Sequence, residues 1–337
     1  MRKDRIVIGL VVFLVFSVIA IGSVRAQTYR WRLGTIQAPS SFTGEGLSLF
    51  AKKVAEKTKG QMKIQIGFSS VFGSLKELVP AVTMGSVEMM VEAQNWWDTI
   101  DKNRKIYVFP YTFSDWDHMT VYVKSPMWQA ELKKLDSQNI HMIFPDPQKP
   151  ILWKKGPTRV ILSKRPIWSA KDLEGLKLRL YESELAKRVW KHMGCNITVV
   201  DWAESYLALK QGMVEAITTP LSETYDMKFH EVAPYITDIN EFLQFFAVVV
   251  NKPKWDKLPP KIQRAMIESA NETALWSNEH LDRRAESDLQ KMMGEGAFFI
   301  RTSLKSFSDK IAPLAKVLED EGMWRKGLFD DIQKLKK

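Results

Sequence analysis

The sequence predicts an α/β protein built from two similar lobes. Three observations lead to this prediction: strand-like and helix-like segments alternate in residues 30–91, the same alternation returns in residues 176–217, and the two stretches share a local likeness. Strands that alternate with helices form largely parallel sheets covered by helices. A chain of 337 residues is long enough for two such lobes, each with its own core.

The first 26 residues have the layout of a secretory signal peptide. Basic residues precede an apolar run at positions 6–22, and a small-x-small pattern ends at Ala26. We expect cleavage there and a mature protein in the periplasm that begins at Gln27. An uncleaved membrane anchor is the alternative, because the apolar run is slightly long. No later segment has the ~18 consecutive apolar residues of a membrane span.

Composition limits the possible partners. The formal charge is +10, and residues 1–26 hold four basic residues and one acidic residue, so the remainder carries +7. A basic protein can steer an anionic ligand, or the charge can belong to a solvated surface. Basic and acidic residues are interspersed, which argues against a nucleic-acid partner. Cys195 is the only cysteine, so no disulfide forms within the chain, and we expect a buried structural thiol.

The first repeat begins with charged and apolar residues that alternate as in a strand. Glycines stop both helices, at Gly60 and Gly85. The predicted elements are, in order, a strand at 30–33, a helix around 47–54, a strand at 62–68, a helix at 75–82 and a strand at 87–91.

The second repeat has the same order of elements. Residues 77–88 and 204–215 agree in identity or apolar class at six of twelve positions, around a shared Glu, Ala, Gly, Val, Glu frame. Twelve residues can match by chance, but the repeated element order supports two similar lobes. The predicted elements are a strand at 176–181, a helix at 185–193, a strand at 197–200, a helix at 203–211 and a strand at 214–217.

The segment at 242–250 is strongly β-forming and lies far from the first repeat, so it is a candidate for a strand that crosses between lobes. A long helical tail begins near Leu258. We expect ligands to bind where the strand ends of both lobes meet. The predicted division is residues 27–156 plus 245–284 for lobe I, and 157–244 plus 285–337 for lobe II.

No catalytic motif is recognisable in the sequence. The sequence lacks a Gly-x-Ser-x-Gly elbow, a His-Glu-x-x-His zinc helix and a phosphate-binding glycine loop, and its five histidines have no ligand spacing. Catalytic groups can lie far apart in sequence, so this does not exclude an enzyme. We expect no catalysis, no cofactor and no metal.

Arg179 stands out because it lies within the apolar segment 176–180. An arginine on a buried strand needs a partner, and a ligand carboxylate can accept two charge-assisted hydrogen bonds from a guanidinium. The alternative is an alternating strand whose Lys177 and Arg179 face water. Aromatic residues follow predicted strand ends at Trp96, Trp97 and Trp202, where they would line a cleft or simply pack in the core.

Several separated motifs resemble the DctP-type solute receptors of tripartite ATP-independent periplasmic (TRAP) transporters. The resemblance extends over nearly all of the chain after residue 26. It is strongest in Asp172-Leu173-Glu174-Gly175-Leu176-Lys177-Leu178-Arg179, in Met193-Gly194, and in Ala203-Glu204-Ser205-Tyr206 through Gly212-Met213-Val214-Glu215-Ala216. It implies a two-lobed periplasmic-binding-protein fold with crossing strands and a long helix that spans both lobes.

The resemblance also implies site residues. Arg179 would pair with the ligand carboxylate, Arg159 would assist it, and Trp202 would pack on the ligand. Many members carry Gln-Glu-Asn-Pro where this chain has Ile217-Thr218-Thr219-Pro220, so Thr219 would replace an asparagine contact. Gln37 adjoins a position of the first strand that is often polar in the family. Fewer polar contacts and more indole suggest a ligand less hydroxylated than a sugar acid, such as an aromatic or branched monocarboxylate or a keto acid.

The sequence thus predicts a monomeric receptor that binds a small organic carboxylate and delivers it to TRAP permease subunits. A secreted enzyme that acts on an organic acid is the alternative, with Glu182 as the one base to nominate beside the carboxylate. A third reading is a receptor that serves a membrane sensor kinase.

Overall fold

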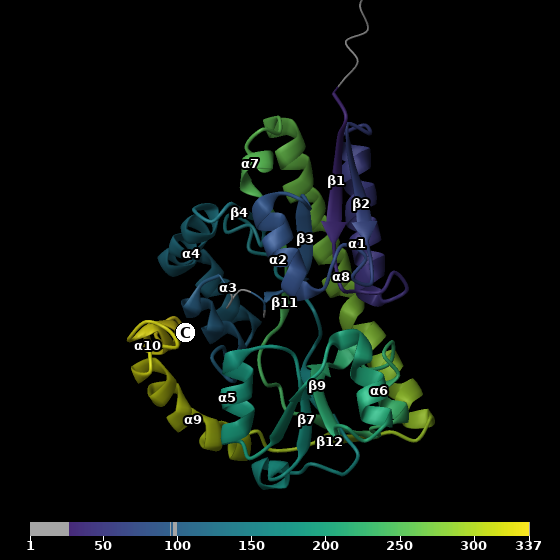
Figure 1. Ribbon diagram of the computed structural model, residues 1–337, viewed down its shortest axis with the longest axis vertical. Helices are drawn as coiled ribbons and strands as arrows, with labels where there is room; N and C mark the ends of the chain where they lie inside the picture. Colours follow the sequence, from purple (N-terminus) through teal and green to yellow (C-terminus); the bar gives the residue numbers. More distant parts are fainter. Residues whose placement is uncertain (1–26, 95, 97–99, 337) are drawn as a thin grey trace, which may run out of the picture.

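The computed structural model describes residues 27–94, 96 and 100–336 and confirms an α/β fold with two lobes (Figure 1). Each lobe contains one sheet. The first sheet has the order β2 (Met62–Gly67), β1 (Tyr29–Gly34), β3 (Met89–Ala93), β11 (Phe245–Asn251) and β4 (Ile140–Phe144), with β5 (Trp153–Lys154) beside β11. The second has the order β12 (Phe298–Arg301), β10 (Tyr235–Asp238), β6 (Arg159–Ser163), β9 (Ala216–Pro220), β7 (Lys177–Leu180) and β8 (Asn196–Val199).

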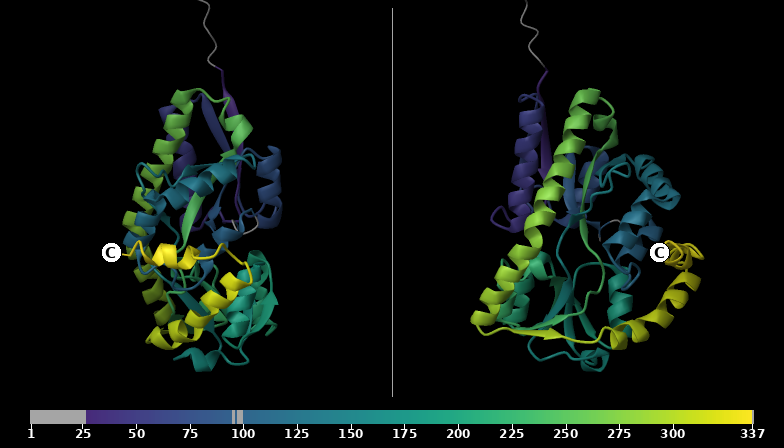
Figure 2. Two further views of the ribbon diagram at one scale, coloured as in Figure 1. Left: turned by 90° about the vertical axis from the view of Figure 1, so that its left-hand side faces the viewer. Right: turned by 180° about the vertical axis from the view of Figure 1, so that it is seen from behind.

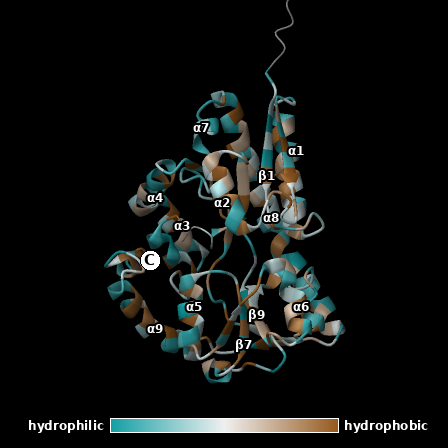
Figure 3. Ribbon diagram, viewed as in Figure 1, coloured by the Kyte–Doolittle hydropathy of each residue, from teal (hydrophilic) through white to brown (hydrophobic). Residues whose placement is uncertain are grey.

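Helices cover both sheets. Their amphipathic sequences bury one face each, and Figure 3 shows hydrophilic and hydrophobic residues side by side along α5 and α9. The helices of the first lobe are α1 (Phe42–Lys57), α2 (Leu75–Met84), α3 (Trp116–Lys124), α4 (Pro126–Asp136) and α7 (Lys252–Trp255). The remaining helices are α5 (Glu184–His192), α6 (Ser205–Lys210), α8 (Pro260–Gly294), α9 (Lys305–Asp320) and α10 (Leu328–Gln333).

The predicted crossing strand is confirmed, and it has a counterpart. β11 follows β10 of the second sheet but pairs antiparallel with β3 and β4 of the first. β6 follows β5 of the first sheet but pairs antiparallel with β9 and β10 of the second. Both sheets are otherwise largely parallel. Each therefore contains one antiparallel strand, which the chain forms directly after crossing from the other lobe.

The sequence echo between 77–88 and 204–215 corresponds to one repeated turn. Gly85 and Gly212 both adopt a left-handed φ of 76°, which a glycine tolerates without strain. In both repeats the valine two residues later donates its N–H to an alanine carbonyl, at 3.2 Å in the first repeat and 3.3 Å in the second. This turn delays β3 and β9 by two residues relative to the strand starts predicted at 87 and 214.

The long helix is confirmed as α8, which has 35 residues and runs along the back of the molecule (Figure 2, right). In its first half, Glu272 pairs with Lys53 of α1 at 2.8 Å. Near its end, Met292 is buried in the core of the second lobe. Within the described residues, no helix is both long enough and apolar enough to cross a membrane.

The C-terminal arm, residues 305–336, contacts both lobes. α9 packs against α5, and Glu321 pairs with Arg188 at 2.7 Å. The chain then reaches the first lobe, where His118 Nε2 lies 2.8 Å from the carbonyl oxygen of Ile332. Figure 2 shows this arm passing from the lower to the upper lobe. The predicted division at residues 285–337 stays a prediction, since the arm belongs to neither lobe alone.

Cys195 is buried as expected, and burial raises the pKa of its thiol to about 12. A thiol with so high a pKa stays protonated and unreactive at neutral pH. This agrees with a structural role.

Glu88 makes the stability of the first lobe depend on pH. Burial alone would raise its pKa, but hydrogen bonds from Arg32 and from Lys254, the latter at 2.6 Å, outweigh burial and lower the pKa to about 2. Since the folded-state pKa lies below the ordinary value of 4.5, this contribution is present above pH 4.5 and is lost as the pH falls towards 2. We expect Glu88→Gln to destabilise the protein by about 1–2 kcal/mol at pH 7.

Thermal unfolding of both proteins between pH 7 and pH 2.5 checks this prediction. The difference in Tm should narrow as the pH falls below 4.5. A constant difference across this range would contradict the proposed linkage.

Candidate functional site

Two chain segments that connect the sheets lie side by side between the lobes. Residues 155–158 lead from β5 to β6, and residues 239–244 lead from β10 to β11. The Lys155 N–H donates to the Gln244 carbonyl at 2.8 Å, and the Asn240 N–H donates to the Arg159 carbonyl at 2.9 Å. Gln37, Glu92, Arg179 and Thr219 lie at or near the carboxyl ends of β1, β3, β7 and β9, as expected for a ligand site in an α/β protein. Arg159 begins the antiparallel strand β6.

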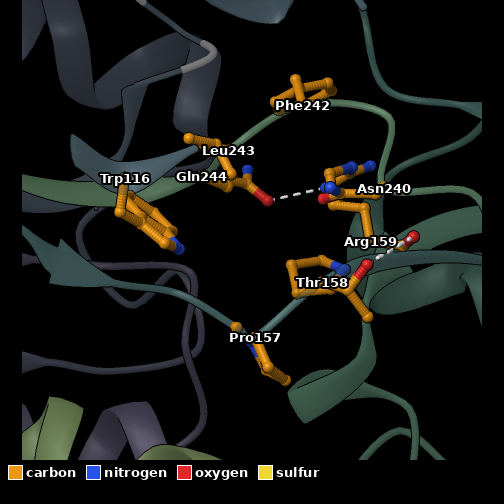
Figure 4. Close-up of a pocket in the computed structure, with 10 residues that line it drawn as sticks. Trp116, Pro157, Thr158, Arg159, Asn240, Phe242, Leu243 and Gln244 are labelled. Atoms are coloured by element: carbon orange, nitrogen blue, oxygen red, sulfur yellow. Dashed lines mark hydrogen bonds between the residues drawn. The ribbon is translucent and has the colours of Figure 1, made fainter. Parts of the chain in front are cut away.

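Arg159 ties these segments to the second sheet. It is buried, and its guanidinium donates to Glu241 at 3.1 Å, to Gln244 at 2.6 Å and to Thr218 at 2.8 Å. Figure 4 shows Arg159 reaching Gln244 beside Phe242, whose ring centroid lies 4.3 Å from the guanidinium carbon. The adjoining cavity is small, with a volume of about 10 Å³. Arg159 is thus largely occupied by protein partners.

Arg179, unlike Arg159, has no direct ion-pair partner among the described residues. It lies on β7 with 4% of its surface exposed, and its Nε donates to the Val200 carbonyl at 2.9 Å. Among the described residues, its Nη atoms make no hydrogen bond and no carboxylate lies within 4.0 Å of the guanidinium. Burial lowers its pKa to about 10, and the charge of Arg159 acts in the same direction, whereas Tyr181 and Asp201 oppose the shift. Arg179 therefore remains a protonated, desolvated cation at neutral pH.

Trp202 lies beside Arg179, and Thr219 is next in the chain to a partner of Arg159. Trp202 belongs to the short helix η4 (Trp202–Glu204), and its ring centroid lies 5.6 Å from the Arg179 guanidinium carbon. Thr219 follows the Thr218 that binds Arg159. Its hydroxyl is buried and has no hydrogen-bond partner among the residues that the structure describes. A buried hydroxyl without a partner costs free energy unless a ligand or water satisfies it.

The first lobe contributes Glu92 and Gln37 at the ends of β3 and β1. Glu92 Oε1 accepts hydrogen bonds from the Thr35 hydroxyl at 2.8 Å and from the Ile36 N–H at 2.6 Å. Gln37 is buried, and its side-chain Nε2 has no hydrogen-bond partner among the described residues. Burial raises the pKa of Glu92, whereas the Lys155 ammonium opposes this shift. Trp96 is buried in the hydrophobic core, and Trp97 lies outside the described residues.

Residues 33–320 match the model of bacterial extracellular solute-binding protein family 7, called DctP. The chain belongs to this family. A solute-binding protein of Verminephrobacter eiseniae is 27% identical over 88% of this chain and 86% of that relative. The 2,3-diketo-L-gulonate-binding periplasmic protein YiaO of Escherichia coli is 25% identical over 86% of each chain.

The fold of this family 7 protein agrees with solved structures. A TRAP periplasmic solute-binding protein from Chromohalobacter salexigens, solved with bound D-glucuronate, superposes with a TM-score of 0.83. It is 22% identical, and the match covers 91% of this chain and 100% of that one. The predicted two-lobed periplasmic-binding-protein fold and the predicted solute-receptor class are confirmed.

Sequence analysis missed three buried charged residues of this receptor. Lys155 lies between Glu92 and Glu223, and its Nζ is 3.8 Å from the Glu223 carboxylate. Glu223 belongs to η5 (Leu221–Glu223), which directly follows β9, and burial raises its pKa. Glu92 was detectable in principle, because it is an acidic residue inside the buried strand Met89–Ala93. Lys155 and Glu223 have no comparable local signal.

Glu182 does not join the other predicted site residues. Its side chain is 66% exposed, and its carboxylate pairs with Lys187 at 2.6 Å. Among the described residues of this family 7 receptor, no group of three or more His, Cys, Asp or Glu side chains could hold a metal ion. The expected absence of a metal stays a prediction.

Proposed function

We propose that this protein is a periplasmic receptor that closes its lobes on one small organic carboxylate and delivers it to the membrane subunits of a TRAP transporter. One observation carries the choice of ligand: Arg179 is a buried cation whose Nη atoms have no partner among the described residues. Burying a charge without a counter-charge is costly, and a carboxylate would remove most of that cost through two charge-assisted hydrogen bonds.

The two arginines have different roles in this proposal. Arg179 binds the carboxylate directly. Arg159 is held by Glu241, Gln244 and Thr218, so its main role is to fix the crossing segments and the positive potential beside Arg179. Direct contact between Arg159 and the ligand stays a prediction.

Trp202 and Thr219 complete the carboxylate end of the site. The indole supplies an apolar wall within 5.6 Å of the Arg179 guanidinium, and the Thr219 hydroxyl is free to donate to a carboxylate oxygen. Trp96, Trp97, Gln37 and Glu182 remain predicted contacts, of which Glu182 has the least support because it is exposed and paired with Lys187.

The relatives support this ligand class. YiaO is named for 2,3-diketo-L-gulonate, and the Chromohalobacter receptor was solved with D-glucuronate. Both ligands carry one carboxylate. Among the described residues, no observation favours a secreted enzyme or a sensor-kinase receptor. Glu182, the base nominated for an enzyme, is exposed and paired with Lys187. We propose a monomer that performs no catalysis and whose signal peptide is removed after Ala26.

Thermal unfolding of the refolded, ligand-stripped protein from Gln27 onwards tests the proposal. Small monocarboxylic acids are compared with their amides, which keep the shape but lack the charge. An acid at 100 times its Kd should stabilise the protein by about 2.7 kcal/mol, a rise in Tm on the order of 5–10 °C. Stabilisation by an amide as strong as that by its acid would refute carboxylate recognition.

A further inference from the structure

A buried polar cluster lies within reach of the same indole ring as Arg179. It consists of Glu92 from β3, Lys155 from the first crossing segment and Glu223 from η5, so both lobes contribute to it. The Lys155 Nζ lies 5.9 Å from the Trp202 ring centroid, and the Arg179 guanidinium carbon lies 5.6 Å from it. The two cationic groups are therefore at most about 11.5 Å apart, a separation that a ligand of a few carbons with a polar group at each end can span.

The Lys155 ammonium is held loosely. Its nearest carboxylate oxygen, on Glu223, is 3.8 Å away, beyond a direct hydrogen bond. Within the described part of the chain, Nζ donates no hydrogen bond within 3.5 Å. It also lies 5.4 Å from the Phe246 ring centroid, so one of its neighbours is apolar. Three N–H donors beside an aromatic ring are thus available to an acceptor that approaches Lys155.

The two acids are acceptors in the same cluster. Glu223 Oε1 accepts one long hydrogen bond, from the Thr43 hydroxyl at 3.4 Å, whereas Glu92 Oε1 is bound by Thr35 and Ile36. Both carboxyl groups are buried, and burial raises the pKa of each. A ligand group at this place therefore meets an ammonium donor and carboxyl acceptors together.

This combination discriminates between ligand groups. A hydroxyl accepts one hydrogen bond and donates another, so it satisfies Lys155 and one glutamate at once. A methyl group would leave both without a partner. A second carboxylate only accepts hydrogen bonds, and it would bring a third negative charge next to two glutamates that share one ammonium.

We propose that Lys155, Glu92 and Glu223 form a second subsite that binds a hydroxyl group at the end of the ligand remote from its carboxylate. The subsite selects hydroxy-monocarboxylates over dicarboxylates and over unsubstituted acids of the same length. This inference rests on the proposed function, because it assumes that Arg179 holds the carboxylate.

Calorimetric titration of the stripped protein with matched probes tests the subsite. Each probe set has one chain length and differs only at the end remote from the carboxylate: 5-hydroxypentanoate, pentanoate and glutarate, with the corresponding four-carbon and six-carbon sets. For the length that binds most tightly, we expect the hydroxy acid to bind about tenfold or more tightly than either analogue. A wild-type protein that prefers the dicarboxylate would overturn the proposal.

Lys155→Met separates recognition from a structural role. It should weaken binding of the hydroxy acid about tenfold and change binding of the plain acid less than about threefold, so the preference disappears. Lys155→Arg should keep the preference in part, because it retains a donor. An equal loss for both probes would assign Lys155 a structural role as an ion-pair partner and refute the subsite.

Two further variants keep the test decisive. If Lys155→Met does not fold, Glu223→Gln should raise the affinity for the dicarboxylate relative to the hydroxy acid, and an unchanged ratio refutes the subsite. Arg179→Ala should abolish binding of every probe. Binding that survives in Arg179→Ala counts against the proposed function itself, as does a wild-type protein that binds none of the probes. If Arg179→Ala abolishes binding but Lys155→Met leaves the preference for the hydroxy acid unchanged, the result counts against the subsite alone.

Discussion

Arg179→Ala should lower the affinity for the cognate carboxylate by about 100-fold or more, which corresponds to about 3 kcal/mol. The guanidinium is desolvated, and Asp201 attracts it only from beyond ion-pair distance, so the ligand carboxylate supplies the direct partner that it lacks among the described residues. The unliganded variant should be as stable as the wild type or more stable, because the substitution removes a buried cation that has no direct ion-pair partner among the described residues. Calorimetry gives the affinity, and thermal unfolding without ligand gives the stability.

Lys177→Ala is the matched control for this experiment. Lys177 lies on the same strand, two residues before Arg179, but is exposed. Its removal should leave the affinity within about twofold, since exposed charges contribute little. Equal losses in the two variants would mean that general positive potential, and not a direct contact with Arg179, attracts the ligand.

Glu241→Ala should be among the most destabilising single substitutions in the protein. Glu241 is buried and accepts hydrogen bonds from Arg159 Nε at 3.1 Å and from Trp190 Nε1 at 3.0 Å. Its removal leaves the Arg159 charge buried without its carboxylate, which typically costs about 3–5 kcal/mol. We expect a fall in Tm on the order of 5–10 °C, measured by circular dichroism without ligand.

Two comparisons make this prediction specific. Glu241→Gln keeps the shape and an acceptor for Trp190 but loses the charge, so it should fall between the wild type and Glu241→Ala. Glu182→Ala removes an exposed acid and should change the Tm little. A loss of less than about 1 kcal/mol in Glu241→Ala would show that water or another group replaces the carboxylate beside Arg159.

The fold was largely predictable because its local signals agree with its global arrangement. Helix-ending glycines and alternating strands gave both βαβαβ units, and the β-forming run before Asn251 gave the strand that crosses back as β11. The crossing of β6 was not predicted. Its direction is fixed by pairing with β9 and β10, which lie far away in sequence, and no local pattern records such a pairing.

The candidate site was predictable only where a charged residue stands within an apolar stretch of sequence. Arg179 is such a residue, a charge within an apolar strand, and the structure buries it. Lys155 and Glu223 lie in short connections whose composition is ordinary, and only the tertiary fold brings them to Glu92. A tryptophan at a strand end, by contrast, is weak evidence for a ligand site. Trp96 lies in the hydrophobic core, where a large apolar side chain is ordinarily found.

The C-terminal arm has a mechanical consequence. β1 begins the first sheet near one end of the described chain, and α10 docks on the first lobe near the other end, where the Gln333 amide donates to the Thr112 carbonyl at 2.6 Å. Both ends of the described chain are therefore attached to the first lobe. A force applied between the two ends would load that lobe and leave the opening of the cleft almost unstrained. A single-molecule experiment that follows opening needs one of its handles on the second lobe, for example at the exposed Lys177.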